Sequence, residues 1–324
     1  MNAIVYYEYG PPDVLRCEEI DKPIPGEKEV LLKIHAASLN PYDWHFIRGE
    51  PYAVRLMAGI GKPKNKRLGS DVAGVVEALG PNVTQFKPGD AVYGLCQGAF
   101  GEFVCTAETK LVKKPESMSF EHAASIPIAA LTALQALRDK GKIQSQHNVL
   151  VNGASGGVGT FGVQIAKSFG AKVTGVTSTR NLDLVRSIGA DHVIDYTQHD
   201  FTKGDQRFDL ILDCVGNHPF SECRRVLNHN GKLIAAGGKT DNWMVAPIAS
   251  MVSAMFQSIF VSQRQVSILA KMNQSDLLAL NELLSTRKVT PVIDRLCKLD
   301  EIPAAIRYLE QGHARGKVIM TIPN

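Results

Sequence analysis

A run of glycines in the middle of the chain could bind a phosphate group. Residues 152–159 read Asn-Gly-Ala-Ser-Gly-Gly-Val-Gly, and they follow an apolar run and precede apolar residues at helical spacing. Glycines let the backbone turn sharply and approach a pyrophosphate, and the free N–H groups of a first helical turn bind negative charge. Strand, turn, helix and second strand in this order predict a dinucleotide-binding turn. The predicted contacts are Ser155, Gly156, Gly157, Val158 and Gly159.

The residues after the next strand indicate which dinucleotide would bind. NAD enzymes usually carry an acid there, about twenty residues after the glycines, and this acid binds the ribose diol. Here the strand 172–177 leads into Ser178-Thr179-Arg180, and no acid is present. A hydroxyl and a guanidinium suit a 2′-phosphate, because they supply a hydrogen bond and a planar cation. The pattern predicts NADPH rather than NADH; the alternative is a helix cap at Ser178 and a solvated Arg180.

A framework of alternating strands and helices would bring these residues together. Five strands and two helices are expected, at 149–151, 172–177, 192–195, 208–214 and 232–236 for the strands, and at 160–169 and 181–188 for the helices. Asn181 is the expected N-cap of the second helix. Strands that alternate with helices form a parallel sheet through right-handed crossovers. The middle of the chain therefore predicts a doubly wound α/β domain.

The flanking parts of the chain have a different rhythm. Residues 1–122 contain β-prone runs at 30–34 and 71–77, separated by Gly and Pro turns, which is typical of a barrel-like β domain. Four elements are expected after about Ser267: a polar helix, a break at Pro291, a helix near 302–311 and a closing strand over 317–322.

Composition excludes several classes of protein. The chain has 324 residues, with 36 Lys plus Arg against 32 Asp plus Glu. The resulting charge of +4 is too small and scattered for a nucleic-acid binder. Six cysteines without a C-x-x-C pair indicate reduced thiols, and the absence of a signal or transit peptide predicts a cytoplasmic protein. The charge-free run 242–263 is interrupted by Pro and Ser, so a buried helix or pocket wall is expected and membrane insertion is not.

The motifs together resemble the medium-chain dehydrogenase/reductase superfamily and, within it, the zinc-free quinone oxidoreductase branch that includes zeta-crystallin. The likeness covers essentially the whole chain, and its motifs besides the glycine run are residues 9–15, 25–27, 36–43, 68–74, 86–90, 213–216 and 316–318. The resemblance implies a GroES-like β-rich domain of residues 1–122 and 267–324, and a Rossmann doubly wound parallel-sheet domain of residues 123–266. The active site would lie in the cleft between them.

Departures from the superfamily pattern point to the zinc-free branch. Zinc alcohol dehydrogenases of the superfamily have a cysteine ligand where this chain has Asn40, and their Gly-His-Glu is replaced by Gly69-Ser70-Asp71. Their structural zinc lobe has four close cysteines, and the region after Asp90 offers only Cys96 and Cys105. A catalytic zinc needs about three protein ligands and an open position. No zinc site is therefore expected.

The resemblance also assigns the remaining site residues. Asn40 and Asp43 would lie at the nicotinamide end of the cleft; Tyr42 would donate a proton or orient a carbonyl, and Tyr52 would stack on substrate. These four are the implied catalytic residues, and for the two tyrosines simple packing is the alternative. The implied cofactor contacts are Asn40, Thr132 beside the nicotinamide ribose, Tyr196 near the adenine, Val215, Gly237, Gly238 and Lys317.

Without zinc, nothing strong polarises an alcohol, and reduction is the easier direction. The expected function is zinc-independent transfer of a hydride from NADPH to a small apolar or aromatic quinone or α,β-unsaturated carbonyl. The alternatives are a zinc-free NAD(P)-dependent alcohol or aldehyde dehydrogenase, and an NADPH-binding structural or regulatory protein. The family implies a homodimer. The run 242–263 would line either the substrate cleft or a subunit interface.

Overall fold

Short apolar runs separated by Gly and Pro turns dominate the first third of the chain, and they form most of one compact unit. The computed structural model describes residues 1–237 and 262–323. In it, the first unit comprises Met1–Ile128, Met272–Asn281 and Pro291–Asn324, and the second comprises Ala129–Lys271 and Glu282–Thr290.

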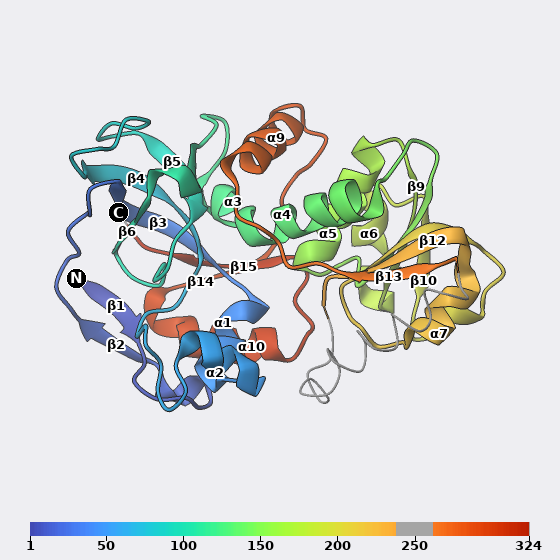
Figure 1. Ribbon diagram of the computed structural model, residues 1–324, viewed down its shortest axis with the longest axis horizontal. Helices are drawn as coiled ribbons and strands as arrows, with labels where there is room; N and C mark the ends of the chain where they lie inside the picture. The colour runs from blue at the N-terminus through green and yellow to red at the C-terminus, as the bar shows by residue number, and fades with distance from the viewer. Residues whose placement is uncertain (238–261, 324) are drawn as a thin grey trace. The chain divides into compact units, whose positions relative to one another are not determined.

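The first unit is built on one largely antiparallel sheet, with strand order β14-β15-β3-β4-β5-β7 (Figure 1). Its strands are β3 (Glu29–Leu39), β4 (Asp71–Leu79), β5 (Ala91–Leu95), β6 (Phe103–Ala107), β7 (Leu111–Lys113), β14 (Ile293–Cys297) and β15 (Lys317–Thr321). The long strand β3 pairs with β6 along its first half and with β15 along its last residues, while β4 runs along its other edge. The predicted strands at 30–34, 71–77 and 317–322 are confirmed as parts of β3, β4 and β15.

Smaller elements complete the first unit. A two-stranded sheet of β1 (Asn2–Val5) and β2 (Arg16–Glu19) lies apart from the main sheet. The helices are α1 (Pro41–Arg48), α2 (Tyr52–Ala58), α3 (Phe120–Ala124) and α10 (Ile302–Glu310). The helix α1 follows β3 directly, so the carboxyl end of the central strand leads straight into the residues expected to do chemistry.

The second unit is a six-stranded parallel sheet with order β10-β9-β8-β11-β12-β13. Its strands are β8 (Asn148–Asn152), β9 (Lys172–Thr177), β10 (His192–Asp195), β11 (Phe208–Asp213), β12 (Leu227–Ala235) and β13 (Arg264–Ser267). This is the doubly wound order 3-2-1-4-5-6, which reverses direction after β8. The five predicted strands are confirmed. The edge strand β13 was missed, because its four residues are mostly polar and exposed.

The helices of the second unit differ slightly from the predicted ones. They are α5 (Gly157–Ser168), α6 (Leu182–Ser187) and α7 (Phe220–Cys223), with α4 (Pro127–Gln135) beginning at the unit boundary. The helix α5 begins three residues earlier than predicted, because the last glycines of the run already have helical geometry. The predicted fold class, a β-rich unit with a doubly wound α/β unit, is confirmed.

The helix α9 (Gln274–Ser285) is divided between the two units, with residues 274–281 in the first and 282–285 in the second. The Tyr93 hydroxyl donates to Asn281 Oδ1 at 2.7 Å, which ties the first part of α9 to the first unit. After the helix, Gln164 exchanges two hydrogen bonds with the backbone of Thr290, at 2.8 and 2.9 Å. The observed units differ from the expected division at residues 123–128, 267–271 and 282–290.

Three sequence expectations concern general properties. All six cysteines lie in the described part of the chain and are free thiols. No helix among the described residues is both long and apolar enough to span a bilayer. The charge-free run 242–263 lies almost wholly outside the described residues.

Candidate functional site

The glycine run forms a tight turn between β8 and α5. Gly153 has a φ of +80°, which favours glycine, and a Cβ on Gly159 would lie 2.0 Å from the Gly153 carbonyl oxygen. The two glycines therefore pack backbone against backbone, and a side chain at position 159 would force the turn open. Gly156 is the N-cap of the twelve-residue helix α5, whose first turn carries no acidic residue. The turn leaves a cradle with free helical N–H groups, which suits an anion.

A group of polar side chains lies behind this turn, and we call Ser155, Thr177, Ser178 and Asn181 the hydroxyl cluster. The Thr177 hydroxyl donates to Ser155 Oγ at 2.8 Å. The Asn181 amide nitrogen donates to Ser155 Oγ at 3.1 Å and to Ser178 Oγ at 3.2 Å. Asn181 Oδ1 is buried and has no hydrogen-bond partner within the described residues. Among the described residues, the cluster thus contains an unused acceptor next to the glycine turn.

The structure tests two sequence interpretations at the end of β9, the capping roles of Asn181 and Ser178. Asn181 was predicted as the N-cap of α6, and this position is confirmed, but its side chain makes no capping bond among the described residues and its amide donates to the two serines instead. Ser178 precedes a short 3₁₀ turn, and its hydroxyl makes no capping bond among the described residues, so the helix-cap alternative finds no support. Arg180 is exposed at the same strand end. The carboxylate of Asp195 faces Thr179 and Thr197, whose hydroxyls both donate to it.

Other predicted cofactor contacts lie at the carboxyl ends of neighbouring strands. The Tyr196 N–H donates to the Thr177 carbonyl at 3.0 Å, so the half-exposed tyrosine lies beside the segment after β9. Val215 follows β11, and its side chain would touch a Cβ placed on Gly153. Gly237 follows β12 against Cys214. Thr132 is buried within α4, and Gly238 lies outside the described residues.

A carboxylate missed by the sequence reasoning holds the loop after β11. Asp213 Oδ1 accepts hydrogen bonds from the N–H groups of Val215 and Gly216 and from the Asn152 side-chain amide, at 2.9–3.0 Å. Asn152 also donates to Asn217 Oδ1 at 2.8 Å. The first residue of the glycine run therefore fixes the loop that borders the turn.

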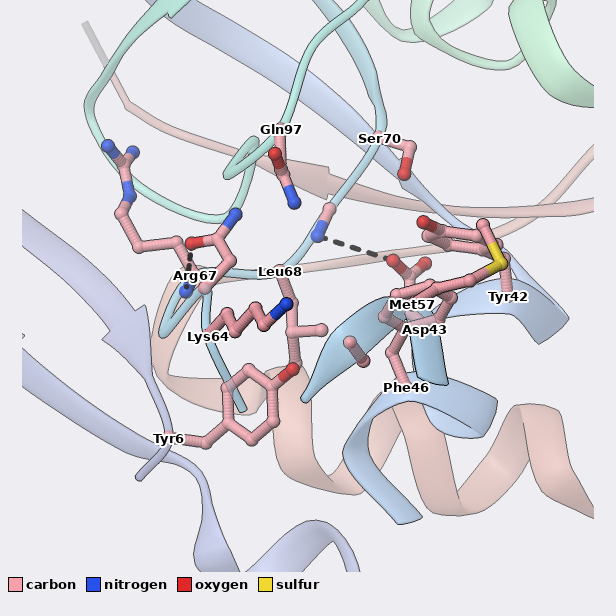
Figure 2. A pocket seen from close by; sticks show the side chains of 13 residues that line it. Tyr6, Tyr42, Asp43, Phe46, Met57, Lys64, Arg67, Leu68, Ser70 and Gln97 are labelled. Atoms are coloured by element: carbon pink, nitrogen blue, oxygen red, sulfur yellow. Dashed lines mark hydrogen bonds between the residues drawn. The ribbon is translucent and has the colours of Figure 1, made fainter. Parts of the chain in front are cut away.

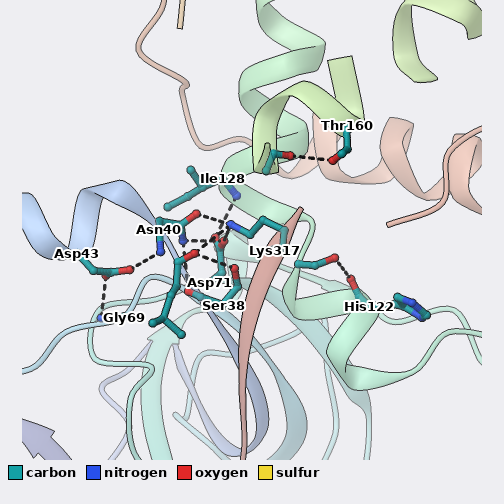
Figure 3. A network of polar contacts seen from close by, with 12 residues as sticks. Ser38, Asn40, Asp43, Gly69, Asp71, His122, Ile128, Thr160 and Lys317 are labelled. Atoms are coloured by element: carbon teal, nitrogen blue, oxygen red, sulfur yellow. Dashed lines mark hydrogen bonds and ion pairs between the residues drawn. The ribbon is translucent and has the colours of Figure 1, made fainter. Parts of the chain in front are cut away.

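The first unit contains a second polar group, Asn40, Asp43, Asp71 and Lys317, which we call the ionic cluster (Figure 3). Lys317 begins β15, and its ammonium donates to Asn40 Oδ1 at 2.5 Å and lies 3.7 Å from the Asp71 carboxylate. The Asn40 amide donates to Asp71 Oδ2 at 2.9 Å. Asp71 Oδ1 accepts from the Ile128 N–H at 3.0 Å. These groups lie between β3, β4 and β15.

Asp43 binds backbone rather than side chains. Its two oxygens accept the N–H of Asn40 at 2.7 Å and the N–H of Gly69 at 3.2 Å. Asn40 is the N-cap of α1, and the Asp43 bond to its N–H closes a capping box. Asp43 thus joins the start of α1 to the residue before Ser70, and Asn40 and Lys317 have their polar atoms engaged inside the unit.

Burial shifts the protonation of the ionic cluster. It raises the pKa of Asp43 to about 7, even though the N–H groups of Asn40 and Gly69 and the Lys317 charge act in the opposite direction. Burial also raises the pKa of Asp71, which Lys317 partly offsets, and lowers the pKa of Lys317 itself. The cluster is therefore stable only while its opposite charges stay paired.

A pocket opens in the first unit next to α1 (Figure 2). It is lined by apolar and polar side chains together: Tyr6, Tyr42, Asp43, Phe46, Met57, Ala58, Lys64, Asn65, Arg67, Leu68, Gly69, Ser70 and Gln97. The Tyr42 ring packs on Phe46 at 4.1 Å between centroids, and 45% of Tyr42 is exposed. Burial and then the Asp43 charge raise the pKa of Tyr42, so its hydroxyl stays protonated. Tyr52, on α2, stacks on Arg55 instead.

The residues at the expected zinc positions do not form a metal donor set. Asn40 Oδ1 accepts from Lys317, Asp71 pairs with the same ammonium, and Ser70 lines the pocket. Zinc in proteins takes thiolate, imidazole and carboxylate ligands, and a cation at hydrogen-bond distance repels a metal ion. Within residues 1–237 and 262–323, no group of three His, Cys, Asp or Glu side chains could hold a metal ion.

The structure brings together residues that sequence reasoning did not connect. Asp71 was noted only as part of a β-prone run and of the triplet that replaces Gly-His-Glu, and the pair Thr177 and Asn181 was assigned to a strand end and a helix cap. The run Thr177-Ser178-Thr179 at the end of β9 gave the signal in the sequence for the hydroxyl cluster. Their meeting with Ser155 depends on the parallel pairing of β8 with β9.

Comparison with known proteins agrees with this architecture. Residues 26–116 match the alcohol dehydrogenase GroES-like domain, and residues 188–320 match the zinc-binding dehydrogenase family. The chain is 33% identical to a chloroplast envelope quinone oxidoreductase homolog of Arabidopsis thaliana, over 99% of this chain and 98% of the relative. It is 34% identical to a 2-methylene-furan-3-one reductase of Solanum lycopersicum, over 99% and 79%. The quinone oxidoreductase of Coxiella burnetii superposes with a TM-score of 0.86 at 31% identity, over 100% and 99% of the chains.

Proposed function

The chain belongs to the quinone oxidoreductase branch of the medium-chain dehydrogenases/reductases, and from this premise we propose that it is an NADPH-dependent, zinc-independent reductase. Its acceptors would be quinones or α,β-unsaturated carbonyls of apolar or aromatic character. The observation that carries the proposal is the glycine turn with the hydroxyl cluster behind it, because this pairing suits a phosphorylated dinucleotide.

The cradle supports binding of a dinucleotide through residues 155–159. Gly153 and Gly159 pack backbone against backbone, which fixes the turn at the N-terminus of α5, where the first helical N–H groups would bind a pyrophosphate. Ser178 and Arg180 at the end of β9 favour a 2′-phosphate over a free ribose diol. The acid nearest this strand end, Asp195, is engaged by the hydroxyls of Thr179 and Thr197. These features support NADPH over NADH.

Zinc independence is supported by the chemistry of the donor set. The zinc-binding name of the matched family would imply a metal, but the positions in question hold Asn40, Ser70 and Asp71, and the Lys317 ammonium lies against Asn40 and Asp71. An ammonium and an amide do not replace a thiolate and an imidazole as ligands. We therefore assign no step to zinc.

NADPH, when bound, supplies a hydride, and the acceptor must hold electron density until a proton arrives. The Tyr42 hydroxyl lines the pocket in its protonated form and can donate a hydrogen bond or a proton to a carbonyl oxygen. The apolar side chains of Phe46, Met57 and Leu68 on the pocket wall suit the ring of a quinone. Asp43 fixes the start of α1 and so the position of Tyr42.

Kinetics with two acceptor panels would test the proposal. NADPH consumption should be measured with quinones and with α,β-unsaturated carbonyls, and alcohol oxidation with NADP⁺ should serve as the third arm. Tyr42→Phe should lower kcat by about tenfold to hundredfold, since a positioned acid commonly contributes at least this much. Tyr7→Phe is the matched control, because it also removes one hydroxyl and keeps the ring, on an exposed tyrosine that does not line the pocket. Binding of NADPH without turnover on either panel would refute the function, and faster alcohol oxidation would favour a dehydrogenase.

Two further expectations belong to this proposal. We propose a homodimer, in line with the family, and size-exclusion chromatography with light scattering would measure it. We also propose a cytoplasmic location, supported by six free thiols, which suit a reducing compartment. Fractionation of cells that produce the tagged full chain would test the location.

A further inference from the structure

Asn181 has an unusual hydrogen-bond balance for a buried side chain. Only 4% of the residue is exposed, and both hydrogens of its amide nitrogen point to serine oxygens, Ser155 Oγ and Ser178 Oγ. Its Oδ1 has no partner among the described residues. A 180° rotation of the amide would pair Oδ1 with the serine hydrogens and leave the nitrogen unpaired instead. One unpaired atom therefore remains in either orientation.

The observed orientation decides where the serine hydrogens point. Ser155 Oγ accepts from Thr177 and from Asn181, which fills both of its lone pairs and leaves its O–H hydrogen as the remaining group. Ser178 Oγ also accepts from Asn181. Ser155 lies in the glycine turn before α5, and Ser178 lies at the end of β9 beside Arg180. Two O–H donors are thus released at the places where a pyrophosphate and a 2′-phosphate would bind.

We propose that Asn181 is a positioning residue that sets the direction of the hydrogen bonds in the hydroxyl cluster, so that Ser155 and Ser178 donate to the phosphate groups of the dinucleotide. This inference rests on the proposed use of NADPH. Asn181 itself touches no phosphate; it acts through the two serines. An anion needs donors, and the amide nitrogen supplies the bonds that keep both hydroxyls in the donating sense.

Asn181→Asp is the sharpest change, because it alters direction with little change in shape. A carboxylate has only acceptors, so both serine hydrogens would turn toward it and their lone pairs would face the ligand. The same change places a negative charge behind the phosphate site. Asn181→Ala removes the amide donor without putting an acceptor in its place. Gln144→Glu is the matched control, since it makes the same amide-to-carboxylate change on an exposed residue before β8, at the opposite edge of the sheet.

Calorimetry on the full chain should compare 2′,5′-ADP with 5′-AMP as probes. We expect Asn181→Ala to weaken 2′,5′-ADP binding about tenfold and Asn181→Asp about hundredfold, as the loss of charge-assisted hydrogen bonds implies. The preference for 2′,5′-ADP over 5′-AMP should fall with them, and Gln144→Glu should match the native chain. Adding Ser178→Ala to Asn181→Asp should cost nothing more, because the serine no longer donates.

Two results would overturn the inference: native preference for 2′,5′-ADP in a folded Asn181→Asp variant, or fully additive losses for Ser178→Ala and Asn181→Asp. If the aspartate variant does not fold, the same cycle with Asn181→Ala decides, and additivity again overturns the inference. The acceptor panels report separately on the proposed function. Coupled loss of 2′,5′-ADP binding in a chain that reduces no acceptor would support the inference and refute the reductase. Turnover with NADPH together with additive losses for Ser178→Ala and Asn181→Asp would support the reductase and refute the inference.

Discussion

The ionic cluster of the first unit and the hydroxyl cluster of the second are both groups of mostly buried polar side chains. They differ in which polar atoms their hydrogen bonds leave without a partner among the described residues. In the ionic cluster, the Asn40 amide binds Lys317 through its oxygen and Asp71 through its nitrogen, and both Asp43 oxygens accept backbone N–H groups. In the hydroxyl cluster, the Asn181 oxygen has no partner within residues 1–237 and 262–323, and the O–H hydrogens of the two serines are not used in the bonds to Asn181.

This difference indicates what each cluster can do. A closed set of bonds has little left to offer a ligand and mainly joins strands that are distant in the sequence. In the hydroxyl cluster, the O–H hydrogens of Ser155 and Ser178 can gain charge-assisted hydrogen bonds when an anionic ligand binds, whereas the Asn181 oxygen, an acceptor, gains none from it. Asn40 and Lys317 stay predicted cofactor contacts, but their bonds also give them a structural role. The comparison therefore assigns stability chiefly to one cluster and binding to the other.

The largest expected effect comes from removing the cation of the ionic cluster. Lys317→Met would leave the Asp71 carboxylate buried without its cation, and such a change costs about 3–5 kcal/mol of unfolding free energy. Urea unfolding would measure this cost. Lys28→Met, at an exposed lysine of the same unit, is the control and should have little effect. Adding Asp71→Asn to Lys317→Met should recover part of the loss. A fully stable Lys317→Met variant would contradict the division between the clusters.

The contribution of the ionic cluster to the free energy of unfolding should also depend on pH. The pKa of Asp43 is raised from 3.8 to about 7, chiefly by burial, so between these values the folded chain holds a proton that the unfolded chain releases. The contribution of Asp43 to stability is therefore complete below about pH 4, falls as the pH rises to about 7, and then stays constant, by at most about 4 kcal/mol.

Unfolding measured across this pH window, with and without Asp43→Asn, would isolate the effect. The asparagine variant should lose this part of the slope, while Asp183→Asn, at a carboxylate that is fully exposed, should keep it. Equal slopes in the native chain and the Asp43→Asn variant would show that the carboxylate is not the source. A stability that rises with pH in this window because of Asp43 would contradict the prediction, since the pKa of Asp43 would then be lowered on folding.

The smallest of the three effects concerns Arg180, which lies close in sequence to the hydroxyl cluster. It is a change in cofactor binding and leaves stability unchanged. Arg180→Ala should weaken NADPH binding by about 1.5–3 kcal/mol, the usual range for a hydrogen bond to a charged group, and leave NADH nearly unchanged. Fluorescence titration of both cofactors would measure it. The control is Arg186→Ala, at an exposed arginine on α6 that pairs with Asp183. Equal loss of both cofactors would count against a 2′-phosphate site.

Local patterns were sufficient for the framework and for part of the site. The strands from β8 to β12, the turn at 152–159 and the missing acid after β9 depend on residues close in sequence, and each was predictable from spacing and side-chain type. The short polar strand β13 was not, because an edge strand needs no apolar run. The roles of Asp71 and Asn181 were missed for another reason: nothing near them in the sequence names their partners.

The sequence by itself determined that a parallel sheet would present a glycine turn, a serine and an arginine at one edge, because these depend on local turn chemistry and strand alternation. Only the tertiary structure decided which polar atoms remain free. Asn181 meets Ser155 across 26 positions, and Lys317 meets Asn40 across 277. Strand pairing sets such distances, and a hydrogen bond forms only within about 3.5 Å. Whether all polar atoms of a buried side chain find hydrogen-bond partners is therefore a property of the folded chain.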